Sequence, residues 1–197
     1  MENKEEIREE ERDERTFFGF WVYLMTDLIM FGALFATFAV LRNNTFGGPG
    51  GKELFKLPYV MIETLILLTS SFTCGLGVLA AQAKNRKMVL TFFGITLALG
   101  LSFLGMEINE FIKLFAEGNG FQRSGFLSSF FTLVGTHGLH ITFGSLWILL
   151  MLINISKKGL THGNIRKLRL LSLFWHFLDI VWIFIFTIVY LLGVIHA

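Results

Sequence analysis

The sequence predicts an all-α integral membrane protein, a single bundle of five transmembrane helices. The first observation is composition, since 53% of the 197 residues are hydrophobic and the mean hydropathy is +0.62, which is too apolar for a water-soluble domain. The second is length, because a helix needs about 20 apolar residues to cross a bilayer and the chain has five such runs. The third is the absence of strict alternation, which favours helices over barrel strands.

We expect the five spans at about residues 17–41, 58–82, 88–111, 126–155 and 170–195, so that 17–197 form the membrane domain. Residues 1–16 hold eight acidic and four basic side chains and almost no apolar ones, so they cannot anchor a core. Glu11 and Arg15 have the i,i+4 spacing that could support a short exposed helix. The composition nevertheless favours a solvated, charged cytoplasmic tail.

The positions of the basic residues predict the orientation of the helices. The tail and the loops at 83–87 and 156–169 carry 12 of the 17 Lys and Arg residues, and the opposite ends of the spans carry 5. The positive-inside rule then places the N-terminus in the cytoplasm and the C-terminus outside. No stripe of basic residues alternates with aromatic ones, so we expect no nucleic-acid partner. The single cysteine, Cys74, excludes an internal disulfide and a cysteine-based metal cluster within one chain.

Small residues recur at close spacing in the second, third and fourth predicted spans. Helices in lipid associate through close van der Waals packing, because apolar burial gives no driving force there. We therefore expect these small residues to mark helix–helix contact faces. They are Ser71 with Gly75, Gly94 with Ala98, Gly100 and Gly105, and Gly135 with Gly138 and Gly144.

Eight ionisable side chains fall inside the predicted spans and are the candidate functional residues. A charged side chain at the centre of a membrane helix costs about 2.5 to 3.5 kcal/mol even on the lower insertion scales, so each must find a partner or lose its charge. The pairs at 107/110, 137/140 and 176/179 are spaced i,i+3 and so share a helix face. The eight residues are Asp27, Glu63, Glu107, Glu110, His137, His140, His176 and Asp179.

Several interpretations of these residues stay open at this point. They could form a mutually satisfied polar core, in which Asp27, a histidine of the fourth span, and His176 or Asp179 make one network across three helices. At least one acid, with Asp27 first, could instead bind a lipid headgroup or exchange protons. Glu107 and Glu110 could simply lie near water at a helix end. Histidines spaced i,i+3 can meet one metal, but no HExxH or CxxCH motif is present, so no metal or haem site is expected.

Four sequence blocks carry a family resemblance that spans nearly the whole chain after the tail. They are FFGFWVYLMTD at 17–27, GMEINEF at 105–111, GTHGLH at 135–140 and WHFLDIVW at 175–182. In this order they resemble subunit III of the haem-copper respiratory oxidases. The mitochondrial type has two additional leading helices, and the present chain is similar to the five-span form found in bacterial cytochrome bo-type ubiquinol oxidases.

The resemblance implies an accessory subunit of a proton-pumping quinol oxidase in the bacterial plasma (inner) membrane. It implies no catalytic residue, metal or redox cofactor in this chain, with haem and copper held by partner subunit I, and with subunits II and IV as further partners. It also implies phospholipid bound in a cleft between helix groups. Asp27 lies where the family commonly has a membrane-buried glutamate near that cleft. For His137, His140, His176 and Asp179 it implies structural or lipid-facing roles.

Alternatives from the same and from other classes remain. The chain could be subunit III of a cytochrome c oxidase, because the chemistry of the electron donor lies in other subunits. It could be a small self-standing transporter or proton channel using Asp27, Glu63 and Glu107, although the inverted repeats and broken helices typical of transporters are not evident. The third alternative is a membrane-anchored haem protein.

Overall fold

The computed structural model describes residues 2–48 and 50–195 and confirms the all-α fold class. Five of its helices are long and apolar enough to cross a membrane, and no strand occurs among the described residues. These helices are α1 (Glu2–Leu41), α3 (Leu57–Gln82), α4 (Arg86–Ala116), α5 (Gly125–Lys158) and α6 (His162–Ile185). Three short elements complete the fold, namely α2 (Gly51–Leu54), the π-helical segment η1 (Phe186–Leu191) and α7 (Leu192–Ile195).

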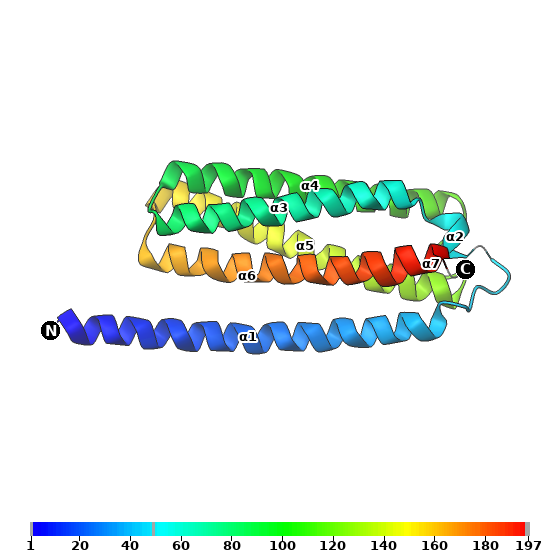
Figure 1. Ribbon diagram of the computed structural model, residues 1–197, viewed down its shortest axis with the longest axis horizontal. Coiled ribbons are helices and arrows are strands. Elements are labelled where there is room, and N and C mark those ends of the chain that lie inside the picture. The colour runs from blue at the N-terminus through cyan, green and yellow to red at the C-terminus, as the bar shows by residue number, and fades with distance from the viewer. Residues whose placement is uncertain (1, 49, 196–197) are drawn as a thin grey trace.

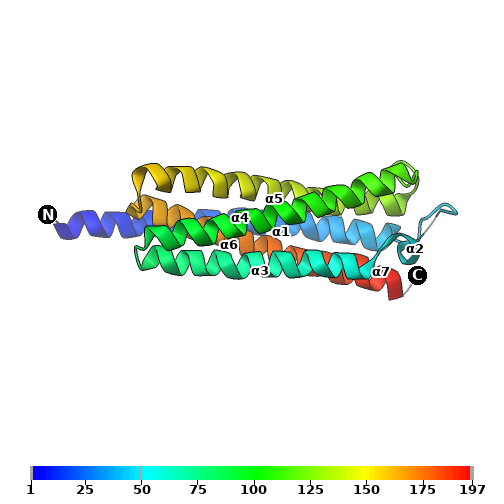
Figure 2. The same ribbon diagram turned by 90° about the horizontal axis from the view of Figure 1, so that it is seen from above.

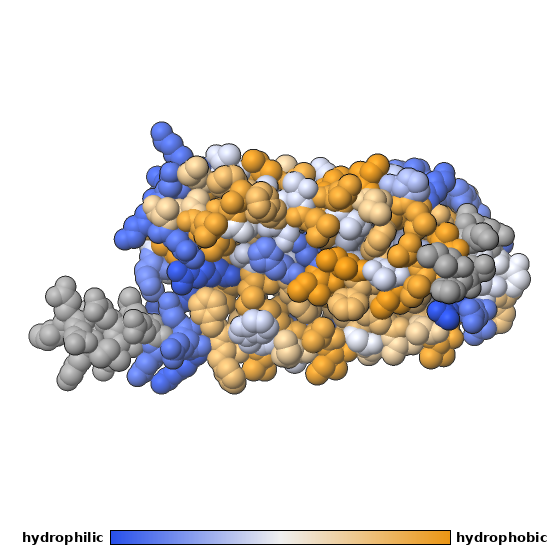
Figure 3. Space-filling view, in the orientation of Figure 1, coloured by the Kyte–Doolittle hydropathy of each residue, from blue (hydrophilic) through white to orange (hydrophobic). Residues whose placement is uncertain are grey.

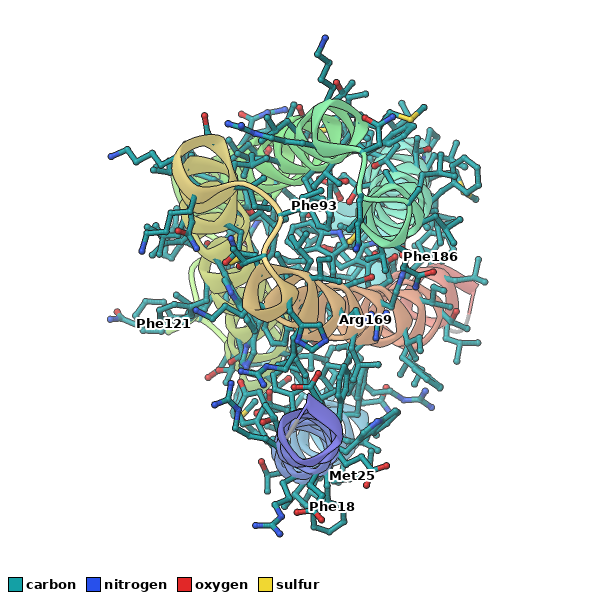
Figure 4. All side chains as sticks on the ribbon, turned by 90° about the vertical axis from the view of Figure 1, so that its left-hand side faces the viewer. Phe18, Met25, Phe93, Phe121, Arg169 and Phe186 are labelled. Carbon is teal, nitrogen blue, oxygen red and sulfur yellow. The ribbon has the colours of Figure 1, made fainter. Side chains whose placement is uncertain are left out.

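The long helices run side by side along one axis (Figures 1 and 2). Viewed end-on, α6 occupies the centre, with α3, α4 and α5 in an arc on one side and α1 on the other (Figure 4). The main packing partners of α1 are α5 and α6, whereas α6 also packs against α3. The last two long helices of the chain, α5 and α6, therefore join α1 to the rest of the bundle.

The starts of three long helices are set by side-chain caps. Asn85, Ser124 and Thr161 each accept a hydrogen bond from the backbone N–H three residues later, which satisfies one of the free donors at a helix start. The cap at Thr161 starts α6 well before the expected start of the fifth span at 170. The C-terminal end of α5 is capped by Gly159, whose positive φ of 74° favours glycine.

The charged segment at the start of the chain is helical in the structure, whereas the sequence favours a solvated tail. Glu11 and Arg15 form the i,i+4 ion pair at 3.6 Å. Asp13 lies 2.5 Å from a guanidinium nitrogen of Arg166 in α6, which fixes this segment to the rest of the molecule. The helix continues into the membrane span because no proline or glycine interrupts residues 2–18.

The molecular surface carries a wide apolar band between two hydrophilic ends (Figure 3). Large hydrophobic side chains are strongly exposed in this band, for example Phe18 and Ile29 at 73% each and Phe72 at 67%. Exposed apolar area of this extent is unfavourable in water and favourable against lipid. The structure is that of a multi-pass membrane protein.

Two fully buried tryptophans of α6 bind the arc of helices together, and we call Trp175 and Trp182 the tryptophan hub. The indole N–H of Trp175 donates to the hydroxyl of Ser70 in α3 at 2.7 Å. Its ring lies so close to Gly100 of α4 and Gly144 of α5 that a Cβ at either glycine would approach it to within 2.9 Å. One side chain therefore contacts three neighbouring helices.

Trp182, two helical turns further along α6, repeats the same arrangement. Its indole N–H donates to the hydroxyl of Thr64 in α3 at 3.0 Å. Its ring packs edge-on against Phe103 of α4, with 4.6 Å between centroids, and stacks on His137 of α5 at 5.3 Å. Since Trp N–H groups need a partner when buried, the two α3 hydroxyls make this packing possible.

The glycines that were expected to mark contact faces divide into two groups. Gly100, Gly138 and Gly144 are close-packed, and a Cβ at any of them would approach a neighbouring side chain to within 3.0 Å. Gly75, Gly94 and Gly105 have no atom within 4 Å of such a Cβ, and at Gly135 the nearest atom lies at 3.8 Å. The expectation is therefore confirmed for the first group, whereas the second group forms no close contact within the described chain, because spacing alone does not determine which side of a helix meets a neighbour.

Candidate functional site

The buried ionisable residues do not form one network. Asp27 of α1 faces His140 of α5, with 3.8 Å between a carboxylate oxygen and Nε2. His176 of α6 instead contacts the hydroxyl of Ser71 in α3, with 2.5 Å between Oγ and Nδ1. Among the described residues, the three-helix network suggested by the sequence is therefore absent.

The contact between Asp27 and His140 leaves a gap. His140 Nδ1 lies 2.7 Å from the carbonyl oxygen of Thr136, so Nδ1 carries a proton. The other nitrogen faces Asp27 at a distance too long for a hydrogen bond. One carboxylate oxygen of Asp27 consequently has no hydrogen-bond partner among the described residues, although the residue is only 8% exposed. The pair is therefore a polar contact between α1 and α5 that leaves this oxygen free for a further hydrogen-bond donor.

Asp179, one turn after His176, is buried; neither of its oxygens makes a hydrogen bond of good geometry within the described chain, but the hydroxyl of Ser71 lies close enough to interact with it. It interacts electrostatically with Cys74 of α3 across the helix interface. Within the described chain, His176 and Asp179 make no direct hydrogen bond to each other. The two side chains share a helix face, but His176 is bonded to Ser71.

His137 of α5 is fully enclosed by aromatic rings. It stacks on Trp182 and meets Phe103 edge-on at 6.0 Å. Neither ring nitrogen has a hydrogen-bond partner among the residues described. This environment favours the uncharged imidazole, which packs as part of the core.

Glu63 of α3 and Glu107 and Glu110 of α4 come together near the end of the bundle that carries α2 and α7, and we call them the carboxyl cluster. Glu63 and Glu107 are 0% and 3% exposed, and three of their four carboxyl oxygens lack a hydrogen-bond partner among the described residues. The carboxyl of Glu107 rests against Gly138 of α5, where a Cβ would lie 2.6 Å from its Oε1. The helix-end position expected for both α4 acids is thus wrong for Glu107, which is buried.

Glu110 differs from the other two members of the cluster in having a donor and a route to the surface. It accepts a hydrogen bond from the hydroxyl of Tyr190 at 2.9 Å. It also lines a cavity of 80 Å³ together with Tyr59, Lys113 and Glu117. Lys113 and Glu117 are exposed residues at the end of α4.

The sequence did not single out Tyr190 as a functional residue, because its place near a helix end is typical of an interfacial aromatic. The structure buries it completely. It belongs to η1, where the N–H of Leu192 donates to the carbonyl of Thr187, five residues earlier. Such π turns rotate the following side chains relative to an α-helix and are frequent at functional sites, but no sequence signal marked this one.

An apolar groove runs between α1 and α6. It has a volume of 440 Å³, and its lining includes Leu28, Phe31 and Phe35 of α1 and Phe177 and Ile180 of α6. The groove also exposes one edge of His176. A groove of this size and character suits an alkyl chain.

Among the residues whose side chains the structure describes, no group of three or more cysteine, histidine or acidic side chains is arranged to hold a metal ion. The buried polar groups instead lie at helix interfaces, and the apolar outer surface is available to lipid or to other membrane helices. Together these features define the class as a multi-pass membrane protein built to pack beside other membrane components.

Comparisons with known proteins identify the family. The family described as cytochrome c oxidase subunit III matches residues 13–194. The chain is 57% identical over 178 residues to a cytochrome bo(3) ubiquinol oxidase subunit 3 of Pseudomonas aeruginosa, covering 90% of this chain and 85% of that protein. It is 50% identical to a quinol oxidase subunit 3 of Bacillus subtilis (89% and 86% covered). It is 47% identical to a cytochrome c oxidase subunit 3 of Bacillus sp. strain PS3 (91% and 86% covered).

The chain therefore belongs to the cytochrome c oxidase subunit III family, and the resemblance found in the sequence is confirmed. Its role is that of an accessory subunit, which associates with the other subunits of an oxidase complex. Subunits of this family are generally without a redox cofactor of their own.

Proposed function

We propose that this chain is subunit III of a proton-pumping quinol oxidase of the bacterial plasma membrane, where it packs on subunit I together with subunits II and IV. The observation that carries the choice of quinol is the identity of 57% with a ubiquinol oxidase subunit, against 47% with a cytochrome c oxidase subunit. The complex would oxidise quinol and reduce oxygen to water at the haems and copper of subunit I. The N-terminus would face the cytoplasm, as the basic loops favour.

The contribution of this chain would be to stabilise subunit I and to retain phospholipid. The groove between α1 and α6 is lined by alkyl and aromatic side chains that match an acyl chain. Phe31 of that lining packs on His140, with 5.3 Å between ring centroids, and His140 faces Asp27. Asp27 thus helps to set the position of α1 and with it the width of the groove.

Isolation of the full chain from its native membrane in mild detergent tests the assignment. We expect a large many-span subunit with haem absorbance to co-purify, together with a companion subunit that lacks a copper-binding cysteine pair. A companion with that pair would make cytochrome c the donor. Recovery of the chain alone and colourless would overturn the proposal in favour of a self-standing transporter.

The substitution Asp27→Asn tests the lipid role. It keeps the size of the side chain but removes the charge that His140 faces. We expect assembly to be preserved, phospholipid per complex to fall, and activity to decay faster during turnover, because α1 loses a contact in a low-dielectric interior. Lipid phosphorus and the decay of oxygen uptake measure this, with the exposed neighbour Thr26→Ser as the control. Unchanged lipid content and unchanged decay would remove Asp27 from the proposed function.

A further inference from the structure

The carboxyl cluster, with two buried members and the half-buried Glu110, is a collection of ionisable groups that the accessory role leaves unexplained. Glu63 of α3 interacts electrostatically with Glu107 and Glu110 of α4, so the three side chains are close enough to repel one another when ionised. The hydroxyl of Tyr190 interacts with all three and donates a hydrogen bond to Glu110. Two helices and the π turn of η1 therefore direct four ionisable groups at one point.

Lys113 interacts electrostatically with Glu110, the outer member of this cluster, whereas Glu63 and Glu107 have no cation as a partner among the described residues. The ammonium group of Lys113 lies over the ring of Tyr59, 5.5 Å from its centroid, at the exposed end of α4. Both carboxyl oxygens of the fully buried Glu63 lack a hydrogen-bond partner among those residues. The ionisable groups that face the cluster are Tyr59 (α3), Lys113 and Glu117 (α4) and Tyr190 (η1), with Lys56 at the start of α3.

Buried carboxyl groups without a cation must be compensated in another way. An ionised carboxylate in an apolar interior carries a large desolvation cost, and adjacent carboxylates that share a site do not all ionise together. A proton held by one carboxyl also supplies the hydrogen-bond donor that the unpartnered oxygens lack. The burial and crowding of these carboxyl groups therefore favour bound protons.

The cavity beside Glu110 supplies the exchange route. It reaches from Glu110 to the exposed Lys113 and Glu117, whereas Glu63 does not line it. The Tyr190 hydroxyl can accept a proton as it gives up its own, so its contact with Glu110 can pass a proton without a net change in its charge.

We propose that the carboxyl cluster is a proton-binding site, which holds protons shared among Glu63, Glu107 and Glu110 and exchanges them with the solvent through Glu110 and its cavity. In each exchange a proton moves from water to the carboxylate of Glu110 and on to Glu107 or Glu63, and the proton displaced from that carboxyl returns through Glu110 to water. No electron transfer is involved. The site is separate from the contact between Asp27 and His140, and the proposal does not depend on the identity of the electron donor.

Infrared spectroscopy of the full chain in its native complex tests this proposal, because protonated carboxyl groups have a carbonyl band that carboxylates lack. At neutral pH we expect such bands in the unmodified protein and the loss of band intensity in Glu63→Gln or Glu107→Gln. Bands unchanged by both substitutions would overturn the proposal. Carboxylate bands that shift with added Na⁺ or K⁺ would indicate a cation site and would also overturn it.

Exchange into D₂O tests the route independently of the buried substitutions. We expect Glu110→Gln to slow the isotope shift of the remaining carbonyl bands by roughly 100-fold, the lower end of what a positioned acid–base group contributes. Tyr190→Phe, which keeps the ring, should slow it by less. The matched control is Glu117→Gln, at the exposed rim of the same cavity, which should leave the rate unchanged. Equal exchange rates in Glu110→Gln and the control would overturn the route, even where Glu63→Gln fails to assemble.

Discussion

The tryptophan hub and the carboxyl cluster are both buried polar regions between the same helices, but they satisfy their polar groups differently. In the hub, each indole N–H finds one hydroxyl of α3, Ser70 for Trp175 and Thr64 for Trp182. In the cluster, both oxygens of Glu63 lack a hydrogen-bond partner among the described residues. Neutral polar groups with matched partners specify how the helices pack. Unmatched ionisable groups are costly to retain, which suggests that they serve a purpose other than stability.

The largest expected effect is the loss of a hub tryptophan. Trp175→Ala removes the side chain that joins α6 to α3, α4 and α5, and we expect a loss of about 3 to 5 kcal/mol, typical of a large aromatic replaced by alanine in a core. Thermal unfolding of the purified complex measures it. Trp21→Ala, which removes a 49% exposed ring on α1, is the control and should have little effect. Equal shifts in the two variants would show that the hub does not hold the bundle together.

Filling the space beside the hub should have the next largest effect. Gly100→Ala places a Cβ at 2.8 Å from the ring of Trp175, so α4 must move away, at a cost of about 1 to 3 kcal/mol. Gly94→Ala on the same helix meets no atom within 4 Å and should be neutral or slightly stabilising. The difference in thermal midpoint between these two variants isolates the close contact from helix propensity.

A pair of hydrogen-bonding substitutions tests the comparison directly. Ser70→Ala leaves the Trp175 indole N–H unpaired, and we expect a loss of about 1 to 3 kcal/mol. Glu63→Gln removes a buried ionisable group from the cluster, and we expect stability to be unchanged or higher, since the amide keeps a hydrogen-bond donor and removes the repulsion from the neighbouring carboxyl groups. Denaturation in detergent measures both, with the exposed Thr69→Ala as the control for α3. A larger loss from Glu63→Gln than from Ser70→Ala would reverse the conclusion about the two regions.

The smallest expected effect concerns the ion pair between α1 and α6 outside the apolar band. Asp13 and Arg166 have side chains 21% and 17% exposed, so Asp13→Asn should cost up to about 1 kcal/mol. The cost should shrink as salt screens the unmodified pair. Thermal midpoints at low and high salt measure it, with Glu14→Gln on the exposed side of the same helical turn as the control. A loss that does not depend on salt would argue against a charge interaction.

Much of the fold could be predicted from the sequence, because the length and apolar character of the segments determine the number of membrane helices. The chemistry of the buried residues also marked Glu63, Glu107 and Asp27 as unusual. Their partners could not be predicted, since an i,i+3 spacing tells which residues share a face but not which helix that face meets. The burial of Tyr190 could not be predicted either, because amino-acid composition does not reveal the π turn that directs its side chain inward.

The position of α1 at the edge of the bundle bears on the order in which the protein is built. This helix leaves the ribosome first, yet its main partners are α5 and α6, which are synthesised last. The contacts between α3 and α4 are local in sequence and can form as soon as that hairpin enters the bilayer. Biogenesis should therefore proceed through an intermediate in which α1 is inserted in the membrane but not yet packed on the bundle. In this intermediate Asp27 lacks its contact with His140, because α5 has not yet been synthesised.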